Sequence, residues 1–254
     1  MAWSMTVAQQ SLTRSLMRLL VLGIPLALVP GYPRADVREG LIAEYRFDES
    51  AGRIASDSSG YHLHGRLEGN PQWVKGYYGN GLHFDGAADY VYIGHNETLE
   101  LTQYTLAAWV RTDGRTTDPE RQEILEKAGA YWLNIRNDAH TLRAGGFFGG
   151  CRGRPYWTYL DTATAVPLHT WTHVASTYNG TVLAIYLNGG LSMSTAEGRP
   201  LCTTNHKLLT IGAKKPEEHA PAEAFFSGVL DEVRMYARAL SQAEIQEVMR
   251  ASRQ

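Results

Sequence analysis

The stretch from Trp171 to Gly189, WTHVASTYNGTVLAIYLNG, predicts two β-strands joined by a tight turn. Asn179 and Gly180 favour a two-residue type I′ turn, because both residue types accept positive φ angles. The arm that follows this turn, residues 182–187, carries apolar side chains on both of its faces. Such a strand is typical of the interior of a β-sandwich, where it is covered from both sides.

Short strand-like segments recur along the rest of the chain and are separated by Gly, Pro, Asn or Asp. A spacing of about ten residues between such segments favours a sandwich or a barrel over βαβ units. One helix is expected at the end, because Ser241 and Glu244 form a capping box. The pattern predicts an all-β fold of antiparallel sheets with a short C-terminal helix. The expected strands are residues 41–47, 63–67, 82–84, 90–93 (a hairpin-like pair with 82–84), 104–112, 122–127, 131–135, 142–148, 157–161, 207–213 and 225–236.

Length and composition indicate one globular domain. The chain has 254 residues, of which 44% are hydrophobic, and no second composition regime marks another domain. The net charge is −2, and no stripe of Lys and Arg offers the positive surface that binds phosphates. Nucleic acid is therefore not an expected partner.

Residues 1–35 differ from the rest of the chain. They contain Arg14, Arg18 and Arg34 but no Asp or Glu, and their apolar run covers residues 19–29. This layout predicts a secretory signal peptide, since the run is shorter than the roughly 20 residues that span a bilayer. The alternative is an amphipathic or disordered tail. With the leader removed, residues 36–254 would form a secreted, periplasmic or cell-surface domain without a membrane span.

The two cysteines, Cys151 and Cys202, both lie after the expected leader. An even count in an oxidising compartment favours a disulfide between them, whereas without export they would be two unrelated thiols. We expect the disulfide. It would tie the Gly-rich insert, residues 147–157, to the segment after the central hairpin.

Four motifs carry a family resemblance: GLHFDGAADYV (81–91), WTHVA (171–175), YLNG (186–189) and LDEVRMYARALS (230–241). In this order they resemble the laminin-G-like jelly roll of the concanavalin A-like lectin/glucanase superfamily. The resemblance implies a two-sheet antiparallel jelly-roll sandwich of about six or seven strands per sheet, with the first and last strands adjacent. The insert at residues 147–157 and the two cysteines depart from the family pattern.

The resemblance also implies a structural calcium ion near the terminal strands. The expected ligands are Asp85, Gly86 and Asp89 at a tight corner and Asp231 on the last strand, because Ca²⁺ prefers carboxylate and carbonyl oxygens. In the alternative reading, Asp85 and Asp89 close the turn through bonds to backbone N–H groups. Asp231 would then pair with Arg234 or face solvent.

No catalytic motif is evident. The related glucanases carry their carboxylates on one strand as E-x-D-x-E, and this chain has no such run. Glu120, Glu123 and Glu126 are spaced by three, which on a regular strand places neighbours on opposite faces. The histidines have no nucleophile at a recognisable spacing, so a non-catalytic domain is expected.

The predicted ligand site depends on aromatic side chains near Gly-rich turns. Trp132, Tyr156 and Trp157 can stack on sugar rings, while Asn134 and Arg152 can bond hydroxyl groups. The alternative is ordinary packing of these rings. We expect an exported, non-catalytic module that binds carbohydrate or another cell-surface partner. A polysaccharide-cleaving hydrolase or lyase, and a structural adhesion domain that works through protein contacts, are the alternatives.

Overall fold

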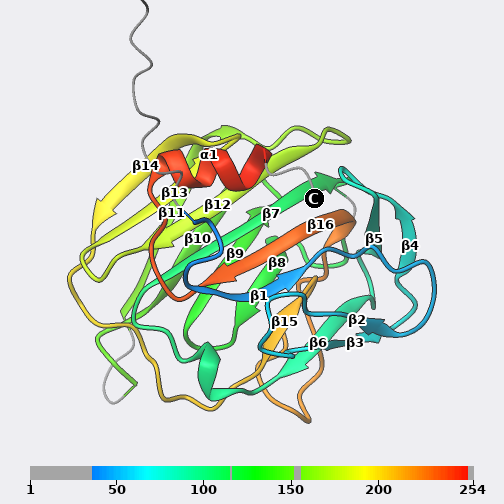
Figure 1. Ribbon diagram of the computed structural model, residues 1–254, viewed down its shortest axis with the longest axis horizontal. Coiled ribbons are helices and arrows are strands. Elements are labelled where there is room, and N and C mark those ends of the chain that lie inside the picture. The colour runs from blue at the N-terminus through cyan, green and yellow to red at the C-terminus, as the bar shows by residue number, and fades with distance from the viewer. Residues whose placement is uncertain (1–35, 115, 152–155, 251–254) are drawn as a thin grey trace, which may run out of the picture. The chain divides into compact units, whose positions relative to one another are not determined.

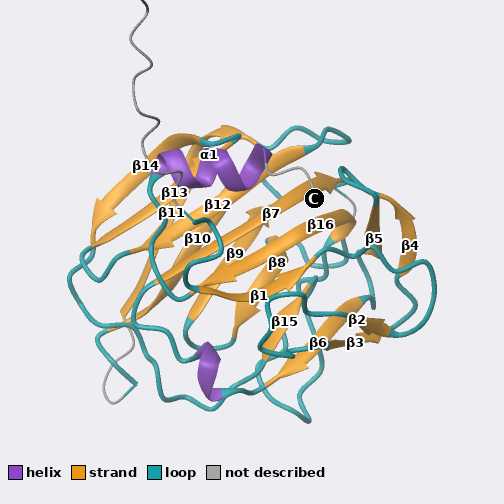
Figure 2. Cartoon of the chain, in the orientation of Figure 1, coloured by secondary structure: helices purple, strands orange, loops and turns teal. Residues whose placement is uncertain are grey.

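The computed structural model describes residues 36–114, 116–151 and 156–250, and the expected leader lies outside this range. The described residues form two antiparallel sheets packed face to face, with one short α-helix (Figures 1 and 2). The all-β sandwich expected from the sequence is therefore confirmed. In this part of the chain, no helix combines the length and hydropathy needed to cross a membrane.

Each sheet has eight strands, more than the six or seven that the resemblance implied, because several short strands extend the edges. The first sheet runs in the order β14 (Gly190–Ala196), β13 (Val182–Leu187), β12 (Thr172–Tyr178), β7 (Tyr104–Thr112), β16 (Ser227–Tyr236), β5 (Asn80–Asp85), β4 (Gln72–Lys75), with β1 (Leu41–Tyr45) also paired to β16. The second runs β11 (Tyr156–Ala165), β10 (Thr141–Phe148), β9 (Tyr131–Arg136), β8 (Arg121–Lys127), β15 (Leu209–Ile211), β6 (Tyr90–Gly94), β3 (Gly65–Glu68), β2 (Ile54–Ala55).

The expected hairpin is formed by β12 and β13, but its turn is not the two-residue type I′ turn predicted. Gly180 has a φ of 93°, whereas Asn179 does not take a positive φ. The Asn179 carboxamide instead accepts the backbone N–H groups of Thr181 and Val182, at 3.0 and 2.8 Å, and so closes a longer turn.

The turn with positive φ at both central residues lies at the other end of β13. Asn188 and Gly189 have φ angles of 48° and 74°, as a type I′ turn requires, and they lead into β14. The central stretch therefore forms three consecutive antiparallel strands rather than two.

Both faces of β13 are buried, as its sequence predicted. Leu183 and Ile185 enter the main core between the two sheets. On the opposite face, a second apolar cluster packs under the helix α1 (Gln242–Arg250), which begins with the expected capping box. That cluster includes Ala175, Ala184, Tyr186, Ile245 and Val248.

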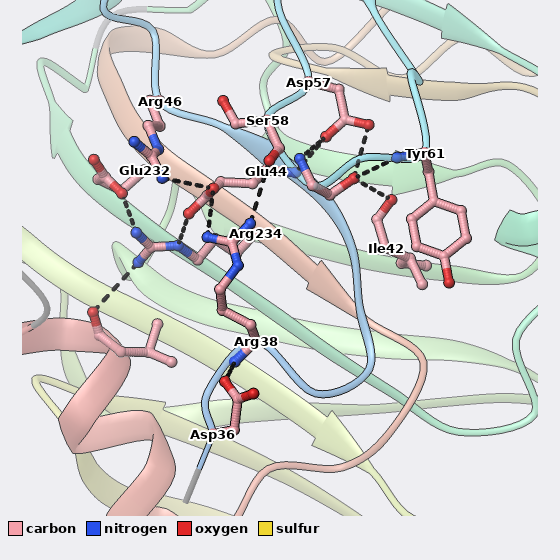
Figure 3. Close-up of polar contacts among 12 residues, drawn as sticks. Asp36, Arg38, Ile42, Glu44, Arg46, Asp57, Ser58, Tyr61, Glu232 and Arg234 are labelled. Carbon is pink, nitrogen blue, oxygen red and sulfur yellow. Dashed lines mark hydrogen bonds and ion pairs between the residues drawn. The ribbon is translucent and has the colours of Figure 1, made fainter. Parts of the chain in front are cut away.

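A buried ion-pair cluster ties the first strand to the last. β1 and β16 are adjacent, with Glu44 opposite Arg234, as the resemblance implied. Arg234 donates to Glu44 Oε1 at 2.9 Å and also to Glu232, so its guanidinium group lies between two carboxylates (Figure 3). Burial raises the pKa of Glu44, but the charges of Arg234 and Arg46 outweigh this effect and hold the pKa below its usual value. Charge-assisted bonds thus hold the terminal strands together.

The corner from Asp85 to Asp89 does not close a hairpin. β5 belongs to the first sheet and β6 to the second, so the corner carries the chain from one sheet to the other. Asp85 Oδ1 accepts the N–H groups of Ala87 and Ala88, at 2.8 and 2.9 Å, and Asp89 Oδ2 accepts the N–H of Asp85 at 3.0 Å. These side chains replace the ladder bonds that the corner interrupts.

Candidate functional site

A pocket of about 210 Å³ lies on the face of the second sheet that points away from the core. Four neighbouring strands, β8 to β11, supply most of its walls. Its lining residues are Arg121, Glu123, Glu126, Ala128, Gly129, Trp132, Asn134, Arg143, Phe147, Trp157, Tyr159, Lys207 and Pro216.

Strand alternation explains how β9 contributes to the pocket. Tyr131, Leu133 and Ile135 point into the core, whereas Trp132 and Asn134 face the pocket. This is the division that the consecutive pair Tyr131 and Trp132 predicts. The strand thus joins the pocket to the hydrophobic core.

An irregularity in β8 places two glutamates on the same face. The pairing with β9 shifts between Glu123 and Leu125, so Glu123 lies opposite Asn134 and Glu126 lies opposite Trp132. Both carboxylates line the pocket, while the two residues between them are buried in the core. A spacing of three was expected to place neighbouring glutamates on opposite faces of the strand. This expectation is wrong for Glu123 and Glu126, because a β-bulge adds one residue between them.

The register of the four strands places residues that line the pocket next to one another across the sheet. Glu126, Trp132, Gly145 and Tyr159 lie opposite one another in sequence across β8, β9, β10 and β11. Gly145 has no side chain between the two rings that flank it. A Cβ at this position would lie 2.7 Å from the Trp132 ring and 2.5 Å from a backbone oxygen, so only glycine fits. The missing side chain lets the Trp132 ring lie against the backbone of β10, next to Tyr159.

Three aromatic rings form one wall of the pocket. Trp132 is 7% exposed and packs against Phe147 and Trp157, with ring centroids 5.7 and 6.0 Å away. Trp157 is 62% exposed, and its ring lies 4.6 Å from that of Phe147. A buried tryptophan thus supports an exposed one, which offers a flat apolar surface to a ligand.

Charged residues form the opposite side. Arg143 makes two hydrogen bonds to Asp161, at 2.7 and 2.8 Å, and its guanidinium carbon lies 4.1 Å from the centre of the Tyr159 ring. Arg121 donates to Glu123 at 2.8 Å. These contacts hold both arginines in fixed orientations.

The two glutamates have unusual acidities. Burial raises the pKa of Glu123 to about 7, even though the charge of Arg121 acts in the opposite direction. Burial and the negative charge of Glu123 raise the pKa of Glu126 to about 8. Burial and mutual repulsion therefore favour retention of a proton by this pair of carboxyl groups.

Three buried oxygens in this floor have no hydrogen-bond donor among the described residues. They are Glu123 Oε2, Glu126 Oε2 and Asn134 Oδ1. Buried acceptors without a donor are costly, and native proteins contain few of them. Hydroxyl groups of a ligand, which both donate and accept hydrogen bonds, would complement Asn134 Oδ1 and this pair of carboxyl groups.

The structure brings together Trp132, Asn134 and Trp157 of the predicted ligand site. Tyr156 lies elsewhere, because neighbouring residues of a strand point in opposite directions, and its ring lies 4.7 Å from the guanidinium carbon of Arg199. Arg152 lies outside the described residues. Glu123, Glu126 and Arg143 also line the pocket but were not predicted for this site from the sequence.

The disulfide between Cys151 and Cys202 is confirmed, with Cα atoms 4.6 Å apart. Next to it, the N–H of Cys202 donates to the carbonyl of Phe147 at 2.9 Å. The disulfide thus anchors the end of β10 that carries Phe147, one of the three rings of the aromatic wall.

The four predicted calcium ligands are not gathered at one point. The ladder places Asp85 opposite Ser227, four residues before Asp231 on β16. The oxygens of Asp231 accept the N–H groups of Tyr78 and Glu232, each at 2.8 Å, and Asp85 and Asp89 bond the backbone of their own corner. Gly86 has a φ of 77°, which its place in the corner requires. The calcium site stays a prediction.

Comparisons with known proteins agree with this architecture. A family model described as the concanavalin A-like lectin/glucanases superfamily matches residues 85–246. Among curated proteins, none matches the sequence.

Several solved structures share the fold at low identity. The binding domain of Paraclostridial Mosquitocidal Protein 1 has a TM-score of 0.66 and 14% identity, with 84% of this chain and 52% of that chain covered. The binding domain of botulinum neurotoxin DC, solved in complex with SialylT, has a TM-score of 0.62, 14% identity and the same coverage. Domain 4 of AbnA, a GH43 extracellular arabinanase from Geobacillus stearothermophilus, was solved in complex with arabinotriose. It has a TM-score of 0.59 and 19% identity, with 83% of this chain and 98% of that chain covered. The present chain thus spans about half the length of the two toxin domains.

Proposed function

The chain belongs to the concanavalin A-like lectin/glucanase superfamily, and from this premise we propose that it is a non-catalytic carbohydrate-binding module of an exported protein. The ligand would enter the pocket on the second sheet and stack on Trp157. Its hydroxyl groups would bond the oxygens in the floor.

One observation carries this proposal: buried acceptor oxygens lie beside an aromatic wall. A sugar ring has an apolar face that stacks on an aromatic ring and an edge of hydroxyl groups that donate hydrogen bonds. Asn134 Oδ1 and the two glutamate oxygens are of the type that such hydroxyl groups satisfy. The site therefore supports a carbohydrate ligand, because these oxygens and the aromatic wall line the same pocket of about 210 Å³.

The comparisons support the same class of ligand. The arabinanase domain, of which 98% is covered by the match, was solved with arabinotriose, and one toxin domain was solved with SialylT. Export is supported by the disulfide, because disulfides persist mainly in oxidising compartments.

A glycan array followed by calorimetric titration tests the proposal, with arabinotriose and sialylated glycans among the probes. Trp157→Ala is expected to weaken binding by about 2- to 13-fold, since a stacked ring contributes about 0.5–1.5 kcal/mol beyond its buried area. Trp132→Ala should also weaken binding, because the buried Trp132 ring supports Trp157. Tyr61→Ala is the matched control, because Tyr61 is 53% exposed and does not line the pocket. Unchanged binding in both Trp variants, with the fold intact, would place the ligand elsewhere.

Cleavage of a polysaccharide is a second candidate function, favoured by the acidities of Glu123 and Glu126. Glycoside hydrolysis needs one protonated and one ionised carboxyl group, and burial together with mutual repulsion raises the pKa of both members of this pair, which favours one proton held between them. An assay for reducing-sugar release at pH 7.5 distinguishes the two functions. An enzyme would release sugar and lose this activity in Glu126→Gln, whereas a binding module releases none from a polysaccharide that it binds.

A further inference from the structure

Two histidines and one glutamate meet outside the glycan pocket. His95 follows β6, Glu100 follows the 3₁₀ helix η1 (Glu97–Leu99), and His206 lies between Cys202 and β15. One potential ligand atom from each lies within 4.8 Å of the other two. From this arrangement we infer a binding site for a divalent transition-metal ion of the zinc class, a function beyond that of the carbohydrate-binding pocket.

The distances suit a tetrahedral ion. His206 Nδ1 lies 3.3 Å from His95 Nε2 and 3.6 Å from Glu100 Oε1. Zn²⁺ binds nitrogen and oxygen ligands at about 2.0–2.2 Å, so its tetrahedral ligands are about 3.3–3.6 Å apart. The remaining pair, His95 and Glu100, has its ligand atoms within 4.8 Å, so an ion would draw these two side chains together to complete its coordination.

The unsatisfied hydrogen-bonding groups point to the same centre. Glu100 Oε1 is buried and accepts no hydrogen bond from the described residues. His206 Nδ1 faces both this oxygen and His95 Nε2, but a ring nitrogen carries only one proton and can donate it to only one of them. A metal ion satisfies all three atoms at once.

The segment that carries His206 is already held in place. The Asn205 side chain donates to the Ala128 carbonyl at 2.7 Å and accepts from Lys127 Nζ at 2.9 Å. The disulfide fixes the same segment at Cys202. Because these contacts preform the site, little ordering would oppose binding of the ion.

The ligand set selects the type of ion. Two imidazoles and one carboxylate suit zinc and similar ions, whereas calcium requires six to eight oxygens. His95 and His206 are exposed, so a water molecule can complete the coordination. Lys207, the residue after His206, lines the proposed carbohydrate pocket, so an ion bound at His206 would also restrict the position of Lys207 in the pocket wall.

The test uses the metal-free full chain with its disulfide intact, titrated with ZnCl₂ by calorimetry. We expect one equivalent of Zn²⁺ to bind, with a rise in Tm of about 5–10 °C at a hundredfold excess over Kd. Co²⁺ should give the visible absorption of a tetrahedral complex, and CaCl₂ should not compete with either ion.

His206→Asn removes the imidazole but suits the backbone, because His206 has a φ of 49° and asparagine tolerates positive φ well. This variant and His95→Ala should each bind Zn²⁺ at least about 10-fold more weakly, since even the partners of metal ligands commonly contribute that much. His219→Ala, which alters an exposed histidine outside the group, should bind like the wild type. Absence of binding to the wild type, or unchanged affinity in both ligand variants, would overturn the proposal.

Discussion

Glu126 is expected to make the protein less stable as the pH rises, and Glu126→Gln should remove this effect. Burial and the charge of Glu123 raise the pKa of Glu126 in the folded protein from 4.5 to about 8. When folding raises the pKa of a group, the folded state is favoured most at a pH below the pKa of that group in the unfolded chain. This stabilisation is lost as the pH rises through the pKa of the group in the folded protein. At about 1.4 kcal/mol per pKa unit, the loss between pH 4.5 and pH 8 has an upper limit of roughly 5 kcal/mol. Movement of the carboxylate toward solvent would make it smaller.

Urea unfolding at pH 5, 7 and 9 measures this effect, with the disulfide intact. Glu126→Gln should resemble the wild type at pH 5 and be more stable at pH 9 by several kcal/mol, because its amide does not ionise. Glu120→Gln is the matched control, since the Glu120 side chain is 79% exposed. If the difference between wild type and Glu126→Gln stayed constant from pH 5 to pH 9, the burial argument would be wrong.

Three further predictions concern other parts of the fold. Cys202→Ser should lower the free energy of unfolding by roughly 4 kcal/mol in the chain-entropy model, because the disulfide spans a sequence separation of 51; an unchanged urea midpoint would contradict this. Burial, assisted by the charge of Arg234, lowers the pKa of His173 to about 3, so the unfolded chain binds a proton there below pH 6.5 while the folded chain does not. His173→Gln should therefore lose less stability than the wild type in an acid titration from pH 6.5 to pH 4, and identical acid midpoints would refute this. Millimolar calcium is expected to raise the Tm relative to EDTA, because an ion at a hundredfold excess over its Kd adds about 2.7 kcal/mol to the free energy of unfolding. Superimposable melting curves would count against the predicted calcium site.

Local periodicity was sufficient to predict most strands and the sides of the sheet that their residues face. Tyr131 and Trp132 occupy the sides that alternation assigns, and both faces of β13 are buried. These outcomes depend on side-chain direction within one strand, which the backbone geometry fixes. The disulfide was also predictable, because the chain has only two cysteines.

The remaining features depend on competition between local interactions. Two Asn-Gly pairs occur in the central stretch, but only Asn188 and Gly189 both take positive φ angles; the Asn179 side chain caps its own turn instead. The corner at Asp85 gives no local sign that its two strands separate into different sheets. The bulge in β8 did leave a signal: the apolar pair of residues 124–125 interrupts strict alternation between two glutamates.

The pocket exists because three irregularities coincide on one face of an otherwise regular sheet. The bulge brings Glu123 and Glu126 to the same side, and Gly145 lets the Trp132 ring lie against the backbone of β10. The disulfide holds the end of β10 where the aromatic wall begins. A side chain at position 145 would push the Trp132 ring away from the sheet, and a strand without the bulge would bury one of the carboxylates in the core. Together these features produce the polar floor and the stacking surface of the pocket, and the proposed carbohydrate site therefore lies on this face.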